Sequence, residues 1–421
     1  MKPIEDGVRA TAFALIHRSV RRRLVQVDGA HNIPIDGAFI LAPNHSSYFD
    51  HYLVETVLFS ARGKPTWFLT KSEAFDKPIS RFWHNVMRCI PVDRGRPTAA
   101  TLARIGQALA DGRALVIYPE GTRGPGDRLL PFKDGAFWFA VRHDVAVIPV
   151  GIAGADQVLA KGTRWPRKAP LRIVFGEALT DNPSLSRSQR IQTLRLQAER
   201  RIPELMADAA MPGADPSGAL GLEVGRQIDA SLRPDGRCPA EALRRLGLLA
   251  ALVPDRGTAE IELPAQRLRL RGLRAMSAGP LRRPVLAYPV RRRALRLLRR
   301  NPEHPMANYL VGRWHLTMPR SLGGRPETGV EHLSRATATA PRSDTRFAMG
   351  LAEALVAAGH PDEAVTPLAL VIEHTPPTDR GYRRVQRAQA LLSAVNSRPS
   401  GVPDDAPVQT FAVTAAVGGS T

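Results

Sequence analysis

The chain has 421 residues, of which 43% are hydrophobic, and a formal net charge of +20. This length predicts two or three domains, and the apolar content is enough to bury a core, which excludes a disordered or fibrous protein. No apolar run approaches the ~20 residues that span a bilayer, and Cys89 and Cys238 lack disulfide or metal-site spacing, so we expect a cytoplasmic protein that meets membranes only peripherally.

The positive charge is unevenly distributed along the chain. Residues 266–300 contain twelve arginines and no acidic residue, whereas residues 1–210 carry 30 Lys+Arg against 20 Asp+Glu. This distribution favours anionic partners, namely phospholipid surfaces, phosphorylated small molecules, acidic carriers or nucleic acid.

The first predicted element is a basic amphipathic helix. Its apolar face is formed by Val8, Ala12, Leu15, Ile16 and Val20. Other positions around the helix include Arg9, Arg18, Arg21 and Arg22. Such a helix either lies in a membrane interface or packs on its own domain.

Short apolar runs then alternate with helical patterns from about residue 37 to 180. The runs expected to be strands are Phe39–Ala42, Trp67–Leu69, Ala114–Tyr118, Val145–Val150 and Leu171–Phe175. Helices are predicted at Ala99–Leu109 and at 187–207. This alternation predicts an α/β domain over residues 1–210, with a largely parallel central sheet flanked by helices.

Residues 211–300 are predicted to be a linker with an arginine-rich segment, because residues 211–240 are rich in Gly, Pro and Asp. Within it, Glu260–Leu263 and Arg267–Leu270 alternate with period two and are expected to pair as a hairpin. Arg291–Arg300 is expected to be a short basic helix, with Ala294, Leu295 and Leu298 on its apolar side. We expect this helix to bind an anionic membrane; solvated or internally paired charge and nucleic-acid binding are the alternatives.

Residues 301–395 contain an internal repeat and are predicted to be a small all-α region. Gly324, Pro326, Leu333 and Pro341 are matched 35 residues later by Gly359, Pro361, Leu368 and Pro376. This period resembles tetratricopeptide repeats, which would offer a surface to a protein partner; a plain helical bundle is the alternative. The tail, residues 396–421, is predicted to be disordered.

Four short motifs occur in order in the α/β region, where strands end or helices begin. They are Asn44–Asp50, Ile90–Arg94, Pro119–Arg123 and the apolar run around Pro149. The set resembles the lysophospholipid acyltransferases, the family of 1-acylglycerol-3-phosphate acyltransferase, whose first three blocks are Asn-His-x-Ser-x-x-Asp, Ile-Pro-Val-Asp-Arg and Pro-Glu-Gly-Thr-Arg. The resemblance covers residues 20–208 and implies an acyltransferase domain there.

The sequence departs from the family pattern at two positions. A glycine that the family usually carries shortly before the second block is Arg88 here, and the residue after the third block, often serine in the family, is Gly124. Both positions bear on the shape of the acceptor pocket and therefore on the substrate.

The first motif supplies the candidate catalytic residues. Acyl transfer to an alcohol needs a base for the hydroxyl proton, and a neutral histidine is suited to accept it. We expect His45 to be this base and Asp50 to hold its ring, since a loop that turns into a helix brings residues of this spacing together. The resemblance implies this pair without a covalent acyl-enzyme. We predict no metal site, and we expect His51 to be structural.

The later motifs supply candidate substrate-binding residues. Arginine binds phosphate oxygens through two hydrogen bonds, and acceptors in the family carry a phosphate, so we expect Arg94 and Arg123 to bind it, with Lys133 as a further candidate. Glu120 and Gly121 are expected to shape the pocket, Glu120 by anchoring the loop or the acceptor, and Thr122 is either a pocket or a turn residue.

The expected function is transfer of a fatty acyl group to lysophosphatidic acid, giving phosphatidic acid at the inner face of the cell membrane. The donor substrate would be acyl-CoA or acyl-carrier protein, and no cofactor is expected. One alternative is another acceptor: a different lysolipid, a glycolipid or another alcohol. A second alternative is a membrane-tethered repeat scaffold that recruits a protein. Nucleic acid is disfavoured because Tyr288 is the only aromatic residue between 266 and 300.

Overall fold

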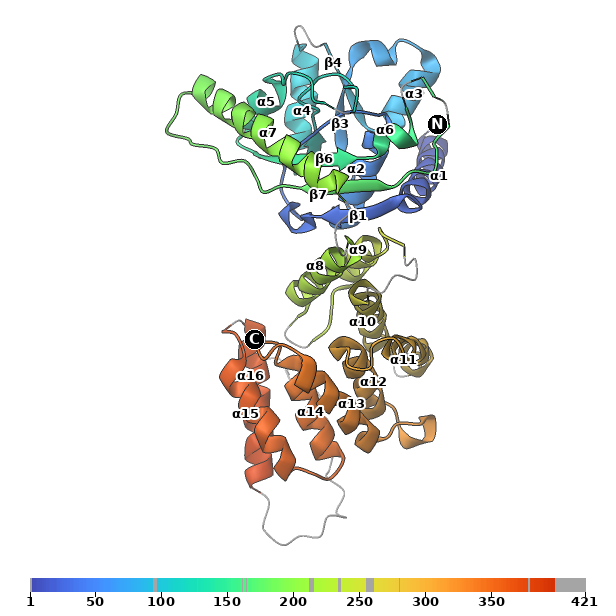
Figure 1. The fold of residues 1–421 in the computed structure, drawn as a ribbon, viewed down its shortest axis with the longest axis vertical. Coiled ribbons are helices and arrows are strands. Elements are labelled where there is room, and N and C mark those ends of the chain that lie inside the picture. The colour runs from blue at the N-terminus through green and yellow to red at the C-terminus, as the bar shows by residue number, and fades with distance from the viewer. Residues whose placement is uncertain are drawn as a thin grey trace, which may run out of the picture. The chain divides into compact units, whose positions relative to one another are not determined.

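The computed structural model describes residues 2–93, 97–126, 128–160, 162–163, 165–211, 216–233, 236–254, 261–279, 281–377 and 379–397 (Figure 1). The chain divides into two compact units. The first unit consists of Met1–Ser231 with Ala240–Arg267, and the second of Leu232–Pro239 with Leu268–Thr421. No helix in the described part of the chain is both long enough and apolar enough to cross a membrane.

A seven-stranded sheet forms the centre of the first unit (Figure 1). Its strands are β1 (Leu24–Asp28), β2 (Phe39–Pro43), β3 (Trp67–Lys71), β4 (Cys89–Val92), β5 (Ala114–Val116), β6 (Ala146–Ala153) and β7 (Leu171–Phe175). Their order is β1-β7-β6-β2-β5-β3-β4, and all neighbours are parallel except β6 and β7. Every residue of β2 is buried, as expected of a central strand that is covered on both faces.

Helices cover this sheet on both sides. They are α1 (Lys2–Arg21), α2 (Phe49–Arg62), α3 (Pro78–Val86), α4 (Ala99–Ala110), α5 (Gly135–His143), α6 (Ala155–Val158), α7 (Arg187–Ala210), α8 (Pro216–Ser231) and α9 (Ala240–Ala250), with 3-10 turns η1 (Ala30–Asn32) and η2 (Ser72–Phe75). Apolar side chains of β2, β5 and β6 form the core together with those of α4, α5 and α7. The long helix α7 begins with a capping box between Ser186 and Gln189 and packs along β6.

The predicted α/β architecture is confirmed, and each of the five predicted strands corresponds to an observed strand. The two predicted helices are present as α4, which is capped by the Thr98 side chain, and as α7. The sequence reasoning missed β1 and β4, the two edge strands. The C-terminal end of α1 packs on its own unit, where Ile16 and Val20 are buried near α2.

The segment 211–300 contains helices where the composition predicts a linker. Helix α8 packs on β1 and α9 packs on α2. The predicted hairpin is wrong: Glu262–Met276 forms the helix α10, and the described residues 261–270 contain no strand. Alternation of polar and apolar residues over four positions also fits a helix, and here Leu263 and Leu270 are buried at helical spacing.

The second unit is helical. It contains α11 (Arg283–Leu298), α12 (Pro305–Thr317), α13 (Pro326–Thr339), α14 (Arg346–Ala357), α15 (Val365–His374) and α16 (Asp379–Asn396), with 3-10 turns η3 (Arg320–Leu322) and η4 (Asp362–Ala364). From α11 to α16 each helix packs on the next along the chain. The tetratricopeptide assignment stays a prediction, and most of the tail predicted to be disordered, from residue 398 on, lies outside the described residues.

Candidate active site

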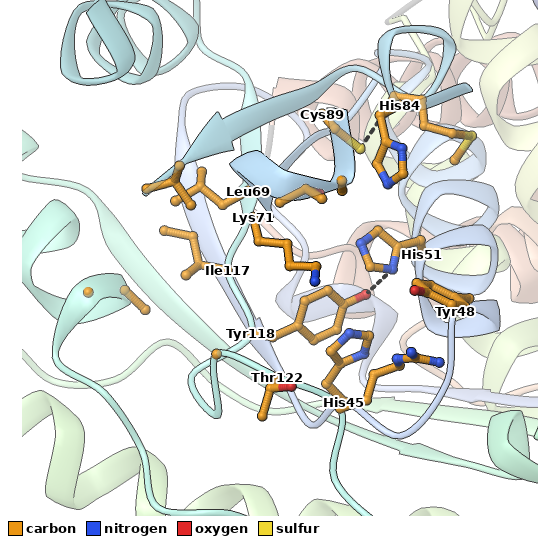
Figure 2. Close-up of a pocket in the computed structure, with 18 of the residues that line it drawn as sticks. His45, Tyr48, His51, Leu69, Lys71, His84, Cys89, Ile117, Tyr118 and Thr122 are labelled. Atoms are coloured by element: carbon orange, nitrogen blue, oxygen red, sulfur yellow. Dashed lines mark hydrogen bonds between the residues drawn. The ribbon is translucent and has the colours of Figure 1, made fainter. Parts of the chain in front are cut away.

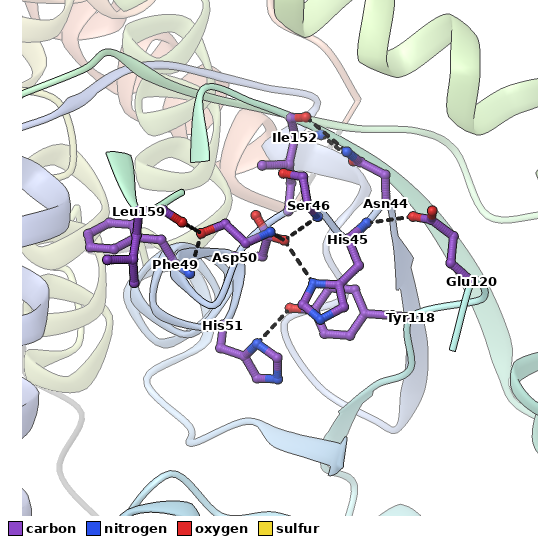
Figure 3. Close-up of polar contacts among 11 residues, drawn as sticks. Asn44, His45, Ser46, Phe49, Asp50, His51, Tyr118, Glu120, Ile152 and Leu159 are labelled. Atoms are coloured by element: carbon purple, nitrogen blue, oxygen red, sulfur yellow. Dashed lines mark hydrogen bonds and ion pairs between the residues drawn. The ribbon is translucent and has the colours of Figure 1, made fainter. Parts of the chain in front are cut away.

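The candidate site begins where β2 ends. The Asn44 side chain makes two hydrogen bonds to β6, donating from Nδ2 to Ile152 O at 3.1 Å and accepting at Oδ1 from Ile152 N at 2.7 Å. Figure 3 shows these bonds beside the turn that leads into α2. Asn44 thus fixes the backbone just before His45 against the neighbouring strand.

His45 and Asp50 form the predicted pair. His45 Nδ1 lies 2.9 Å from Asp50 Oδ2, and this oxygen also accepts hydrogen bonds from the backbone N–H groups of Ser46 and Ser47, each at 2.8 Å (Figure 3). Asp50 is fully buried in the first turn of α2, where the positive end of the helix stabilises a carboxylate. The other ring nitrogen of His45 makes no hydrogen bond to any described residue, and His45 lines the cavity.

Tyr118 stacks on the His45 ring. Their ring centroids are 3.9 Å apart with an interplanar angle of 22°, and the Tyr118 hydroxyl lies 3.4 Å from His51 Nδ1. Burial raises the pKa of Tyr118 well above its usual value and lowers the pKa of His51 well below its usual value, so that both groups are neutral at pH 7. His51, expected to be structural only, also lines the cavity.

Glu120 supports His45 through the backbone. Its Oε1 accepts a hydrogen bond from His45 N at 2.8 Å, and its Oε2 accepts one from Leu130 N at 2.9 Å. Burial raises the pKa of the Glu120 carboxyl, and these two hydrogen bonds oppose that rise. Gly124 N donates to His45 O at 2.7 Å, so the third motif and the residue that follows it hold both peptide groups of His45. Glu120 itself does not line the cavity.

The remaining residues of the third motif line the cavity together with Lys133. Gly121 has a φ of 66°, so its backbone conformation favours glycine, and the Lys133 side chain passes close to it. The Arg123 guanidinium lies 3.7 Å from the centroid of the Tyr48 ring, and Thr122 is exposed at the rim. Arg94, the other predicted phosphate ligand, lies outside the described residues.

The cavity has a volume of about 600 Å³ and combines a cationic part with an apolar part. Figure 2 shows His45, Tyr118 and Lys71 projecting into it from the turn after β2, the end of β5 and the end of β3. Its cations are Lys71, Arg123 and Lys133. Its apolar wall includes Leu69, Met87, Val92, Ile117 and Phe139. Among the described residues, no cluster of three or more His, Cys, Asp or Glu side chains is placed to hold a metal ion.

Sequence reasoning missed several cavity residues, namely Tyr48, Tyr52, Lys71, Trp83 and His84. Lys71 carried a signal, because it closely follows the predicted strand Trp67–Leu69, at the same edge of the sheet as the other motifs. Trp83, on α3, carried none: its indole N–H donates to the Tyr52 hydroxyl at 3.1 Å, a contact between helices that only the fold creates.

Arg88, the first departure from the family pattern, does not line the cavity. Its φ is 54°, in the left-handed region that favours glycine, and its guanidinium lies 5.4 Å from the centroid of the Phe13 ring on α1. The substitution therefore affects the backbone after α3 and the contact with α1 rather than the cavity wall.

The N-terminal part of the chain is similar to known acyltransferases. The profile of the Acyltransferase family matches residues 24–153. The chain is 30% identical over 142 residues to the chloroplastic 1-acyl-sn-glycerol-3-phosphate acyltransferase LPAT1 of Arabidopsis thaliana, covering 33% of this chain and 38% of that protein. It is 27% identical over 184 residues to the 1-acyl-sn-glycerol-3-phosphate acyltransferase of Bacillus subtilis (strain 168), covering 43% of this chain and 87% of that protein.

A third relative has a different name. The chain is 37% identical over 123 residues to the lyso-ornithine lipid O-acyltransferase of Brucella abortus (strain 2308), covering 27% of this chain and 44% of that protein. The chain thus spans less than half of the plant and Brucella relatives. The family match contains the His45–Asp50 pair and the Pro119–Arg123 loop, and the N-terminal part of the chain therefore contains a domain of the acyltransferase family.

Proposed function

We propose that the protein transfers a fatty acyl group from acyl-CoA or acyl-carrier protein to the free hydroxyl of lysophosphatidic acid, giving phosphatidic acid for phospholipid synthesis. One observation carries this proposal: the His45 ring is held by Asp50 at 2.9 Å and lines a cavity that also contains cations and apolar side chains. The names of the plant and Bacillus relatives support the same acceptor.

The chemistry follows from the two ring nitrogens of His45. The nitrogen bonded to Asp50 carries the proton, so the opposite nitrogen is left with a lone pair that accepts the acceptor's hydroxyl proton as the oxygen attacks the thioester carbonyl. The imidazolium that forms is stabilised by the Asp50 carboxylate, and it returns the proton to the departing thiolate. The two backbone N–H groups on Asp50 Oδ2 keep the carboxylate in place during this exchange.

The cavity provides for both ends of a lysolipid. Arg123, Lys133 and Lys71 place positive charge near His45, and each charge-assisted hydrogen bond to a phosphate contributes roughly 1.5–3 kcal/mol. Arg94, predicted from the second motif, stays a proposed phosphate ligand. The apolar wall suits a hydrocarbon chain. Since such acceptors and products are lipids, we place the reaction at a membrane surface, on the cytoplasmic face.

The test is phosphatidate formation by the purified protein. We expect His45→Ala to lower kcat by about 10²–10⁴-fold, the usual contribution of a positioned base. Asp50→Asn should lower kcat by a smaller factor, since the base itself remains. His360→Ala, at an exposed histidine of the second unit, is the matched control and should leave the rate unchanged. Full activity in the His45 variant would rule out this mechanism.

A second candidate acceptor is a lysolipid with another head group, which the similarity to the lyso-ornithine lipid enzyme favours. An acceptor panel separates the two. If lysophosphatidic acid is the substrate, Arg123→Ala should raise the KM for lysophosphatidic acid about tenfold or more, because one charge-assisted contact with the phosphate is lost. The same variant should leave the weak activity on the dephosphorylated acceptor unchanged. An equal kcat/KM of the wild-type protein for lysophosphatidic acid and for its dephosphorylated form would favour the second candidate.

A further inference from the structure

One face of α11 carries a single stripe of exposed residues whose chemistry changes along the helix. Leu281, just before the helix, and then Val285 and Tyr288 are 92%, 72% and 57% exposed. The same stripe continues through three exposed arginines, which are Arg292, Arg296 and Arg299. Successive members are separated by three or four residues, the spacing that keeps side chains on one side of a helix.

The opposite face of α11 packs against the rest of the second unit. Val290, Ala294 and Leu297 are buried, and the Arg291 guanidinium lies 4.4 Å from the centroid of the Trp314 ring on α12. The apolar side that the sequence predicts, which includes Ala294, is therefore occupied by packing on α12. The exposed stripe is the face of α11 that points away from this packing.

The charge of the stripe is uncompensated. Residues 266–300 contain no acidic residue, and Arg292, Arg296 and Arg299 form no ion pair with any described residue. Exposed apolar side chains next to unpaired arginines on one helix face are typical of a helix that lies in the interface of an anionic bilayer. The arginines meet the lipid phosphates, and the apolar side chains enter the boundary between head groups and acyl chains.

We propose that this stripe of α11 docks the protein on an anionic phospholipid membrane, with Leu281, Val285 and Tyr288 inserted and the three arginines bound to phosphates. Nucleic acid fits the arginines but not the apolar part, because single-strand binding relies on stacked aromatic rings and Tyr288 is the only one in this segment. The proposal does not depend on the acyltransferase reaction, since vesicle binding needs no turnover.

The experiment is co-sedimentation of the full-length protein with vesicles of phosphatidylcholine, with or without phosphatidylglycerol. Each arginine near the surface contributes about fivefold to binding, so Arg292→Gln, Arg296→Gln and Arg299→Gln together should weaken binding to the anionic vesicles about 100-fold. Leu281→Ser, Val285→Ser and Tyr288→Ser together should also weaken that binding, including at high salt, where the electrostatic contribution is screened.

Two sets of exposed residues in the same unit serve as matched controls. Arg335→Gln, Arg342→Gln and Arg383→Gln remove the same charge, and Leu322→Ser with Tyr382→Ser removes exposed apolar side chains. Both control variants should bind vesicles like the wild-type protein. Equal losses in the control set would show that net charge alone drives binding and would overturn the proposal. Vesicle binding that is unaffected by the substitutions Leu281→Ser, Val285→Ser and Tyr288→Ser would also overturn the proposal. The same holds if the substitutions Arg292→Gln, Arg296→Gln and Arg299→Gln abolish binding to a single-stranded RNA while vesicle binding persists.

Discussion

At the scale of single residues, the position of the candidate base depends on three neighbouring side chains. Asp50 holds the His45 ring, Tyr118 stacks on that ring, and Glu120 accepts the backbone N–H of His45. Glu120 is 2% exposed, so water cannot replace it as an acceptor for the two N–H groups that it binds. Its contribution to activity is therefore indirect, through the position of His45.

Glu120→Ala should both destabilise the protein and lower its activity. It leaves the N–H groups of His45 and Leu130 without an acceptor, and each such loss costs about 1–3 kcal/mol. Glu120→Gln keeps one good acceptor and should lose less on both measures. Urea unfolding measures the loss of stability, and acylation rates measure the loss of activity. Glu363→Ala, at an exposed glutamate, is the control. Equal stability of the Ala variant and the wild-type protein would contradict the anchoring role.

The sequence predicted the local part of the site and missed the part that the fold assembles. His45 and Asp50 are predictable because they are close in the chain and belong to a motif. Trp83 and His84 reach the cavity from α3, and no spacing in the sequence relates them to His45. Such residues become visible only when the order of the strands is known.

At the scale of elements, burial decides what the sequence reveals. Central strands such as β2 are covered on both faces and appear as continuous apolar runs, whereas the missed strands β1 and β4 lie at the edges of the sheet. β4 also contains Pro91, which further obscures a strand pattern. In α10, the alternation that suggested a hairpin is too short to exclude a helix.

The contact between β6 and α7 should not tolerate a side chain at Gly151. A Cβ there would lie 2.2 Å from the backbone carbon of Leu205, so strand and helix would have to separate. We expect Gly151→Ala to lower the free energy of unfolding by about 3 kcal/mol or to prevent folding. Gly7→Ala is the control, because a Cβ there meets nothing within 4 Å, and its melting temperature should not fall. A melting temperature of Gly151→Ala equal to that of the wild-type protein would contradict the close packing.

Helix α2 carries a buried acid that should make stability depend on pH. Burial raises the pKa of Glu55 to about 7, against the opposing hydrogen bonds with Thr66. The folded chain therefore binds this proton more tightly than the unfolded chain, so the contribution to stability is present below pH 4.5 and is lost as pH rises through about 7.

Glu55→Gln removes this titration while retaining an acceptor for Thr66 N. Relative to the wild-type protein, the variant should gain about 3 kcal/mol of unfolding free energy between pH 4.5 and pH 8. Urea unfolding of both proteins across this range measures the difference, in which other titrating groups cancel. A difference that stays constant with pH would contradict the raised pKa.

At the scale of the whole molecule, the candidate site and the arginine-rich helix belong to different compact units. All described site residues lie between Asn44 and Leu159, in the first unit, whereas α11 belongs to the second. The match to the Bacillus acyltransferase covers 87% of that protein but only 43% of this chain. The match to the acyltransferase family, residues 24–153, lies within the first unit.

A chain that ends at Met276 should retain acyltransferase activity on a soluble substrate and lose much of its affinity for anionic membranes. It retains the first unit and all of α10 but lacks α11. We expect kcat/KM for a water-soluble, short-chain lysolipid to remain within about threefold, a change of less than 1 kcal/mol in the transition-state free energy. Binding to anionic vesicles should fall. A soluble, folded truncation without activity would show that the second unit contributes to the site itself.

The central position of β2 has a consequence for how the protein is made. The ribosome delivers this fully apolar strand early, but its two sheet neighbours, β5 and β6, emerge only after long intervening segments. Until then both edges of β2 lack hydrogen-bonding partners, which is the condition under which nascent chains associate or recruit chaperones. Asn44 can bind Ile152 only when β6 has been synthesised. The backbone before His45 is therefore fixed at the same step at which one edge of β2 gains its hydrogen-bonding partner.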